Sequence, residues 1–198
     1  MAVVVIAVTA SGLLAGACGD DDVDDGAVSS TSTIATTTTT QPIVEPAPSM
    51  PDVQPESGTG VVVIGGGEAV TLEVVGCTID ASAQPEGQVP AELVSATAGG
   101  TTASGAELLV EVRRFRSLGA SPTVTDTVTL VEGDPEAPDR ALVAQRFEVD
   151  GLVTDLRDPD ADDPLLRVSG STIEGSGVFA PPGDTVGSVE ARLRVVCS

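Results

Sequence analysis

The chain has 198 residues and a formal net charge of −21, with 30 acidic side chains against nine basic ones, all of them arginine. It contains no His, Lys, Tyr, Trp or Asn, so Ser–His–Asp, Cys–His and Ser–Lys catalytic arrangements and imidazole metal ligands are excluded. The acidic charge also argues against binding to nucleic acid or electrostatic attachment to an anionic membrane face.

Residues 1–17 are typical of a secretory signal. An uncharged run of small and apolar residues, VVVIAVTASGLLAGA, ends directly before Cys18. The run is shorter than the ~20 residues that a membrane-spanning helix needs, and its small residues suit a cleavage site. No Lys or Arg precedes it, which a true start upstream of Met1 would explain. We expect a signal peptide over 1–17, with a buried N-terminal helix or strand as the alternative.

Residues 18–59 predict a disordered tether. The segment begins with the charge run GDDDVDDG, continues through SSTSTIATTTTTQP and ends in a proline-rich stretch. Such sequence cannot bury enough apolar surface to offset the entropy lost on ordering, and its proline-rich end favours an extended, polyproline-like conformation. Thr and Ser near Pro are also the composition of O-glycosylated stalks. The aspartate run indicates a solvated segment rather than a loose calcium site.

From residue 60 to residue 198 the sequence alternates with the two-residue period of β-strands. In VEARLRVVC one face carries Val189, Ala191, Leu193, Val195 and Cys197. Other β-branched runs, among them AVTLEVV and TVTDTVTLV, are separated by turn-forming clusters such as IGGGEA, EGDPEAPD and APPGD. These patterns predict an all-β domain, a single antiparallel β-sandwich or partly open barrel of about eight to ten strands. We expect a core of Val, Leu, Ala and Ile with Phe115, Phe147 and Phe179.

The three cysteines, Cys18, Cys77 and Cys197, need an account because their number is odd. An exported chain folds in an oxidising compartment, where two of the thiols are expected to pair. If Cys77 pairs with Cys197, the bridge closes a loop of roughly 120 residues and stabilises the fold by at most about 5 kcal/mol. Two separate buried thiols are the alternative. Cys18 is then left over, next to the cleavage position.

The sequence LLAGAC at residues 13–18 resembles the lipobox of bacterial lipoproteins, in which signal peptidase II cuts before the cysteine and its thiol carries diacylglycerol. It departs from that motif at Ala15, where Leu is preferred. Together with the Ser/Thr tether, the stretches VVVIGGGEAVTLEVVGC and VSGSTIEGSGVFAPPGDTVGSVEARLRVVCS resemble the mycobacterial nineteen-kilodalton lipoprotein antigen family. The resemblance covers both ends of the chain and is poor between residues 85 and 165.

This resemblance implies a glycosylated, surface-exposed lipoprotein antigen of an actinobacterium, with adhesive or immune-stimulating behaviour. Cys18 would be the lipidated residue, and Cys77 and Cys197 would form the disulfide. Acyl chains on Cys18, palmitate among them, would hold the protein at the outer face of the cytoplasmic membrane or in the cell envelope without a basic patch. The region that such proteins glycosylate corresponds to Thr31, Thr33, Thr36, Thr37, Thr38, Thr39 and Thr40.

The best candidate for a metal site is the acidic stretch DPDADDP. Asp158, Asp160 and Asp162 match the first three ligand positions of a calcium loop. Asp163 stands where an EF-hand needs Gly, and Ser169 stands where it needs Glu, so an EF-hand is excluded. An irregular calcium turn and an ordinary acidic loop both remain open.

For the β domain we expect no enzymatic activity, no catalytic residue, no metal and no cofactor. The glycine run in IGGGEA lacks the spacing of a nucleotide site. A carboxylate-dependent glycoside hydrolase usually binds its sugar on aromatic faces, and this chain has no Trp or Tyr. The first hypothesis is a lipid-anchored domain displayed for binding, adhesion or structural purposes. The alternative is an envelope carrier of a lipid or other apolar ligand held between the sheets.

Overall fold

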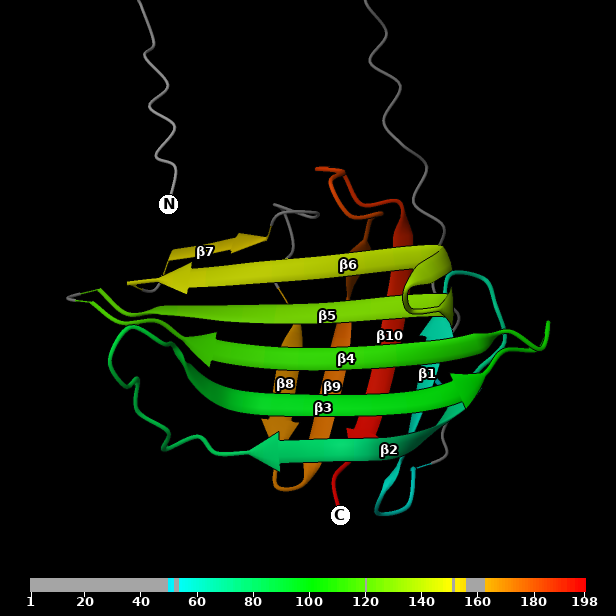
Figure 1. Cartoon of the computed structure of the whole chain (residues 1–198), viewed down its shortest axis with the longest axis horizontal. Coiled ribbons are helices and arrows are strands. Elements are labelled where there is room, and N and C mark those ends of the chain that lie inside the picture. Colours follow the sequence, from blue (N-terminus) through cyan, green and yellow to red (C-terminus); the bar gives the residue numbers. More distant parts are fainter. Residues whose placement is uncertain (1–49, 52–53, 120, 151, 156–162) are drawn as a thin grey trace, which may run out of the picture. The chain divides into compact units, whose positions relative to one another are not determined.

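Ten β-strands make up the regular structure of the described residues (Figure 1). The computed structural model describes residues 50–51, 54–119, 121–150, 152–155 and 163–198. Within these ranges there is no helix, and hence none that could cross a bilayer. The strands are β1 (Thr59–Ile64), β2 (Val70–Ile79), β3 (Ala91–Thr101), β4 (Glu107–Arg116), β5 (Thr123–Asp134), β6 (Ala137–Val149), β7 (Leu152–Asp155), β8 (Leu166–Ser169), β9 (Thr172–Phe179) and β10 (Val189–Val196).

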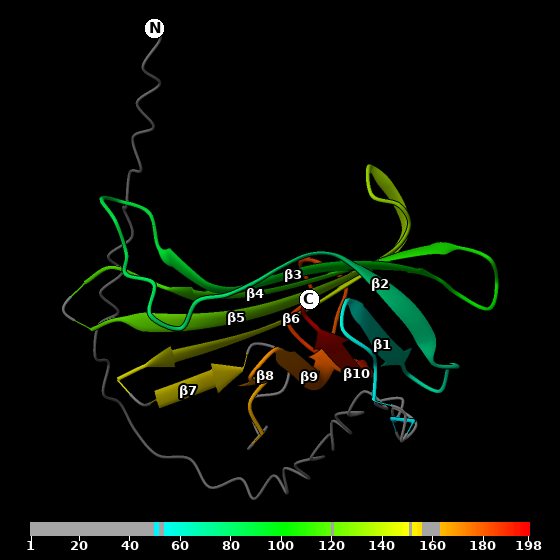
Figure 2. The ribbon, with the colours of Figure 1, turned by 90° about the horizontal axis from the view of Figure 1, so that it is seen from below.

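All ten strands belong to one antiparallel sheet with the order β7-β6-β5-β4-β3-β2-β1-β10-β9-β8. The sheet curls strongly, so that β2 to β6 form one layer and β1, β10, β9 and β8 form a second layer that crosses it (Figure 1, Figure 2). A further bridge joins the layers, since the backbone N–H groups and carbonyls of Val143 and Ala180 bond to each other at 2.8 and 3.1 Å. The predicted all-β antiparallel architecture is confirmed, in the form of a half-barrel.

The core lies between the two layers, where the inward-facing side chains of the long strands meet. On β10 every second residue is buried, as the sequence period predicts. The opposing layer contributes mainly Val, Leu and Ala, and each large side chain contributes about 1.5–3 kcal/mol when it is buried. The largest fully buried side chains include Leu72, Leu130, Leu165, Leu166, Ile173 and Phe179.

The aromatic part of the core is smaller than expected. Phe179 is 1% exposed, but Phe115 and Phe147 are only partly buried. These two residues lie on either side of Thr125 in the ladder of β4, β5 and β6. The expectation that all three phenylalanines fill the core was wrong, because the two-residue period puts Phe115 and Phe147 on the face opposite to the buried residues of their strands.

The stretch EGDPEAPD at residues 132–139, expected to be a loop, is mostly strand. β5 runs to Asp134 and β6 begins at Ala137, so only two residues connect them. The register shifts at Gly133, whose φ is 88°, a conformation that favours glycine. This bulge lets both strands continue into a tight turn despite the nearby prolines.

Candidate ligand-binding pocket

Toward one end of the sheet, the inward-facing side chains of β4, β5 and β6 change from aliphatic to charged. On β4 the buried residues end at Val112, and Arg114 follows on the same face. In the ladder, Arg114 lies opposite Asp126, Asp126 lies opposite Arg146, and Arg146 lies opposite Asp155. These four residues form a row of alternating charge across β4 to β7, which we call the charge row.

The pair of Arg114 and Asp126 is held by two parallel hydrogen bonds. Nε of Arg114 donates to Oδ1 of Asp126 at 2.6 Å, and Nη2 donates to Oδ2 at 2.8 Å. Nη2 also donates to the carbonyl of Leu166 at 2.9 Å, which ties β4 to β8 in the other layer. Because Asp126 is only 6% exposed, this paired geometry is what compensates the burial of its charge.

The electrostatics of the pair follow from this geometry. The hydrogen bond to Asp126 raises the pKa of the Arg114 guanidinium above its ordinary value. Burial acts in the opposite direction, and the negative charges of Asp126 and Glu148 add to the rise. Arg114 therefore stays fully ionised in the folded protein.

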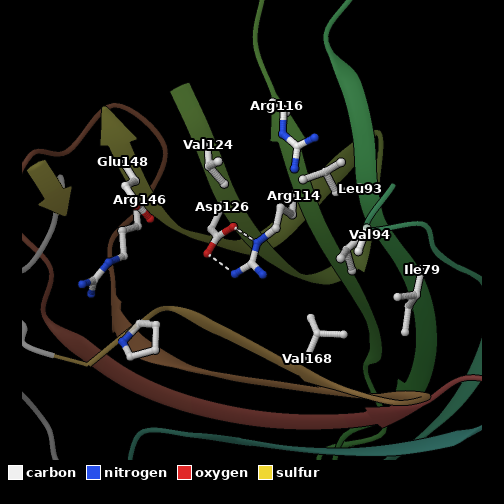
Figure 3. A pocket seen from close by; sticks show the side chains of 12 residues that line it. Ile79, Leu93, Val94, Arg114, Arg116, Val124, Asp126, Arg146, Glu148 and Val168 are labelled. Carbon is white, nitrogen blue, oxygen red and sulfur yellow. Dashed lines mark hydrogen bonds and ion pairs between the residues drawn. The ribbon is translucent and has the colours of Figure 1, made fainter. Parts of the chain in front are cut away.

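A pocket with a volume of about 410 Å³ lies between the layers beside this pair (Figure 3). This volume falls in the range of small-molecule sites, about 300–1,000 Å³. β2 to β6 contribute residues from one layer and β8 contributes Val168 from the other. The lining is Ile79, Ala81, Leu93, Val94, Arg114, Arg116, Val124, Asp126, Arg146, Glu148, Pro164 and Val168.

A β-bulge in β3 builds the apolar wall of the pocket. The register of β3 against β4 shifts between Glu92 and Val94, so Leu93 is an extra residue in the ladder. Leu93 and Val94 are consecutive, yet they are only 5% and 3% exposed. A regular strand would turn one of them outward, and the bulge instead places both toward the core.

Two further arginines line the charged side of the pocket. Nη1 of Arg116 donates to the carbonyl of Ala83 at 3.3 Å, and no carboxylate in the described ranges forms an ion pair with Arg116. Figure 3 shows its guanidinium pointing into the opening between the strands. Arg146 points away from the Arg114–Asp126 pair and donates to the carbonyl of Asp163. Arg116 is thus the cation that faces the pocket without a neutralising neighbour among the residues described.

The pocket can hold a ligand that combines an anionic group with an apolar body. Its lining contains no Ser, Thr or Cys and so presents no hydroxyl or thiol nucleophile, and both carboxylate oxygens of Asp126 accept hydrogen bonds from Arg114. No group of three or more His, Cys, Asp or Glu side chains placed to hold a metal ion occurs in the part of the chain that the structure describes.

Cys77 and Cys197 form a disulfide, with their Cα atoms 5.6 Å apart and a sequence separation of 120 residues. Cys77 lies on β2 and Cys197 directly follows β10, and these two strands flank β1 in the sheet. This is the pairing that the resemblance implied, and it leaves Cys18 as the remaining cysteine of the chain.

Several of the predicted positions lie outside the described residues. These are the signal peptide over 1–17, Cys18, most of the tether, the threonines from Thr31 to Thr40, and Asp158 to Asp162 of the acidic stretch. Asp163, the last aspartate of that stretch, is described and exposed. Its Oδ1 accepts a hydrogen bond from Nη2 of Arg167 at 2.6 Å.

The charge row was not predicted from the sequence, although part of its signal is readable there. Arg114 has the same parity as the buried Val112, and Asp126 has the same parity as the buried Val128. A charged residue in phase with the apolar face of a strand indicates either a buried ion pair or a polar pocket. The register that sets Arg114 opposite Asp126 is not readable in this way.

The fold and the pocket define an all-β half-barrel with an opening of ligand size between its layers. The chain matches no known protein family, and no curated protein and no solved structure is significantly similar to it.

Proposed function

We propose that the protein is an exported lipoprotein of the cell envelope that is anchored by a lipid on Cys18. The observation that supports this proposal is the pairing of two of the three cysteines. With Cys77 joined to Cys197, Cys18 is the cysteine left for acylation, and it directly follows the apolar run of residues 3–17. A disulfide between strands distant in sequence is typical of exported proteins. The resemblance to the mycobacterial nineteen-kilodalton lipoprotein antigens supports the same function, with O-glycosylation of the threonine-rich segment.

In this proposal the β domain binds a ligand and does not catalyse a reaction. The pocket supports a binding role because its volume suits a small molecule and its lining combines an apolar wall with arginines. It offers no hydroxyl or thiol nucleophile. The acidic residues after Cys18 would form a hydrated spacer, which keeps a domain of high negative charge away from an anionic bilayer.

Metabolic labelling with a palmitate analogue tests the anchor. The full chain is expressed in a bacterium that processes lipoproteins, as the wild type, as Cys18→Ala and as the control Ser29→Ala. We expect label in the wild type and in the control, no label in Cys18→Ala, and an intact mass that lacks residues 1–17. Equal labelling of Cys18→Ala would reject the lipid anchor.

The second candidate function is an envelope carrier of a lipid or other apolar ligand, and the apolar wall of Leu93 and Val94 favours it. A carrier is expected to leave the cell with its ligand bound. Native mass spectrometry of the purified protein separates the two functions, because a small molecule that copurifies indicates a carrier, whereas an empty pocket indicates a displayed domain that binds its ligand reversibly.

A further inference from the structure

We infer that the pocket binds a single-chain amphiphile with one negative charge, of the kind represented by a medium-chain fatty-acid anion. This inference rests on the proposed binding role of the β domain and names the ligand class for it. It does not depend on whether Cys18 carries a lipid.

The charge of the pocket selects a negatively charged head group. The chain has only nine arginines in 198 residues, and three of them, Arg114, Arg116 and Arg146, line this one opening. The lining also contains two carboxylates, Asp126 and Glu148. Its net charge is therefore +1, in a protein whose net charge is −21. A local excess of positive charge in a strongly acidic protein favours an anion at this place.

Arg116 is the residue that would receive the head group. Asp126 engages Arg114 through two hydrogen bonds, and Arg146 points away from this pair and donates to the carbonyl of Asp163. The guanidinium of Arg116 points into the opening and donates one hydrogen bond within the described residues, to the carbonyl of Ala83. A guanidinium has five N–H donors, so Arg116 keeps donors for a carboxylate in the two-pronged geometry that this pair prefers.

The nearby carboxylates favour a head group with a single charge. Asp126 and Glu148 line the same pocket, and a doubly charged phosphate monoester would meet their repulsion. A monoanion can be neutralised by Arg116 while it stays away from both carboxylates. We therefore expect a carboxylate to bind more tightly than a phosphate monoester on the same alkyl chain.

The remaining walls suit one short alkyl chain. Ile79, Leu93 and Val94 lie along one side and Val168 lies across from them on β8 (Figure 3). A volume of about 410 Å³ corresponds to about a dozen heavy atoms, taking ~30 Å³ for each, the share of a water molecule in the liquid. This matches a carboxylate with a chain of about ten carbons and is too small for a lipid with two chains.

The test uses the full chain with Cys18→Ala, which takes no lipid and needs no detergent. Its affinity is measured by titration calorimetry for decanoate, decanol, decyl phosphate and decyltrimethylammonium, each below its micelle concentration. We expect decanoate to bind about tenfold or more tightly than decanol, because hydrogen bonds to a charged group are lost with the alcohol. Decyl phosphate is expected to be weaker than decanoate, and the cation is expected not to bind.

Three variants assign the recognition to Arg116. Arg116→Met is expected to weaken decanoate about tenfold and to leave decanol unchanged, whereas Arg116→Lys keeps most of the preference for decanoate because it keeps the charge. Arg113→Met is the matched control, since Arg113 lies on the same strand with an exposed side chain facing away from the pocket. It is expected to bind all four probes as the parent does.

Two results in the Cys18→Ala parent would overturn the inference: equal affinities for decanoate and decanol, or no binding of any of the four probes. This part of the test does not depend on whether the Arg116 variants fold. An unchanged preference in Arg116→Met would also overturn it. The binding test uses a chain without Cys18, so a negative binding result does not affect the conclusion from palmitate labelling. In the same way, a negative labelling result does not affect the conclusion from the binding test.

Discussion

Asp126 is a buried charged side chain, and its partner among the described residues is Arg114. Its two oxygens accept hydrogen bonds from Arg114, and Arg114 in turn bonds to the carbonyl of Leu166 on the opposite layer. A buried ion pair of this kind adds little net stability compared with a well-packed apolar pair, but removal of one partner leaves an uncompensated buried charge. The pair therefore contributes more to specifying the register of β4 and β5 than to the free energy of unfolding.

This asymmetry gives a prediction for stability. Arg114→Met is expected to lower the free energy of unfolding by about 3 kcal/mol because it leaves Asp126 without a partner. The double variant Arg114→Met/Asp126→Leu is expected to return to within about 1 kcal/mol of the wild type, since neither charge is then buried. Urea unfolding followed by circular dichroism measures both. A double variant no more stable than Arg114→Met would show that the pair, and not the isolated charge, stabilises the sheet.

The raised pKa of Arg114 also sets a pH dependence. A cation whose pKa is higher in the folded state contributes stability that is fully present below its ordinary pKa and is lost only as the pH rises through the raised pKa of the folded state. The difference in unfolding free energy between the wild type and Arg114→Met should therefore stay constant between pH 7 and pH 10. A difference that shrinks across this interval would mean that Arg114 is not the cation that holds Asp126.

Among the strands, β2 and β10 are joined by a covalent bond that reaches past β1. β1 begins at Thr59, opposite Glu73 of β2, and Cys77 lies further along β2, beyond the point where β1 begins. Cys197 follows the end of β10, and its N–H donates to the carbonyl of Ser171 at 2.8 Å. The disulfide thus closes the sheet where β1 no longer separates the two strands.

Removal of this disulfide should destabilise the protein. The double variant Cys77→Ser/Cys197→Ser is expected to lose about 2–5 kcal/mol of unfolding free energy, because the bridge restricts a loop of 120 residues in the unfolded chain. A reducing agent should lower the melting temperature of the wild type to about that of the double variant and leave the melting temperature of the double variant unchanged. Equal melting temperatures of the wild type with and without reductant would contradict this expectation.

Two glycines on neighbouring strands should respond oppositely to the same substitution. A Cβ on Gly100 of β3 would lie 2.5 Å from the carbonyl oxygen of Thr71 and 3.0 Å from side-chain atoms of Leu72 and Val70, so Gly100→Ala is expected to cost about 1–3 kcal/mol. Gly76 of β2 has no atom within 4 Å of such a Cβ, and Gly76→Ala is expected to be neutral or slightly stabilising. Chemical denaturation of both variants measures the contrast, and equal stabilities would contradict it.

The architecture was predictable from the sequence where it depends on the two-residue alternation of apolar and polar side chains along a strand. The alternation in VEARLRVVC predicts which residues of β10 are buried, because a half-buried strand has no other way to arrange its side chains. The strand order and the pocket were not predictable, because they depend on register between segments far apart in sequence. Nothing near Arg114 in the sequence shows that it meets Asp126, and nothing near Leu93 shows that a bulge turns it toward the core.

The boundary between tether and domain can be tested by proteolysis. The first arginine of the chain is Arg113, so trypsin has no site before the domain, whereas a protease that cuts on the N-terminal side of aspartate can cut before Asp24 and before Asp52. We expect rapid cleavage there, because the sequence predicts a disordered tether over 18–59, and a resistant fragment that ends at Ser198. Mass spectrometry of the non-reduced products identifies it. Cleavage within the strands at a rate similar to that before Asp24 and Asp52 would contradict the boundary.

The place of β1 in the sheet determines how the domain would carry tension. β1 is the first strand after the N-terminal part of the chain, and it bonds to β10 on one side and β2 on the other, with the N–H of Gly58 already bonded to the carbonyl of Val196 at 2.8 Å. A pull from the membrane side would load both ladders in shear, and the Cys77–Cys197 bond would prevent the two neighbours from separating. A pull applied instead to one of the short outer strands, β7 or β8, would break its hydrogen bonds one after another. A domain tethered in this way would be held through an interior strand that is bonded on both sides.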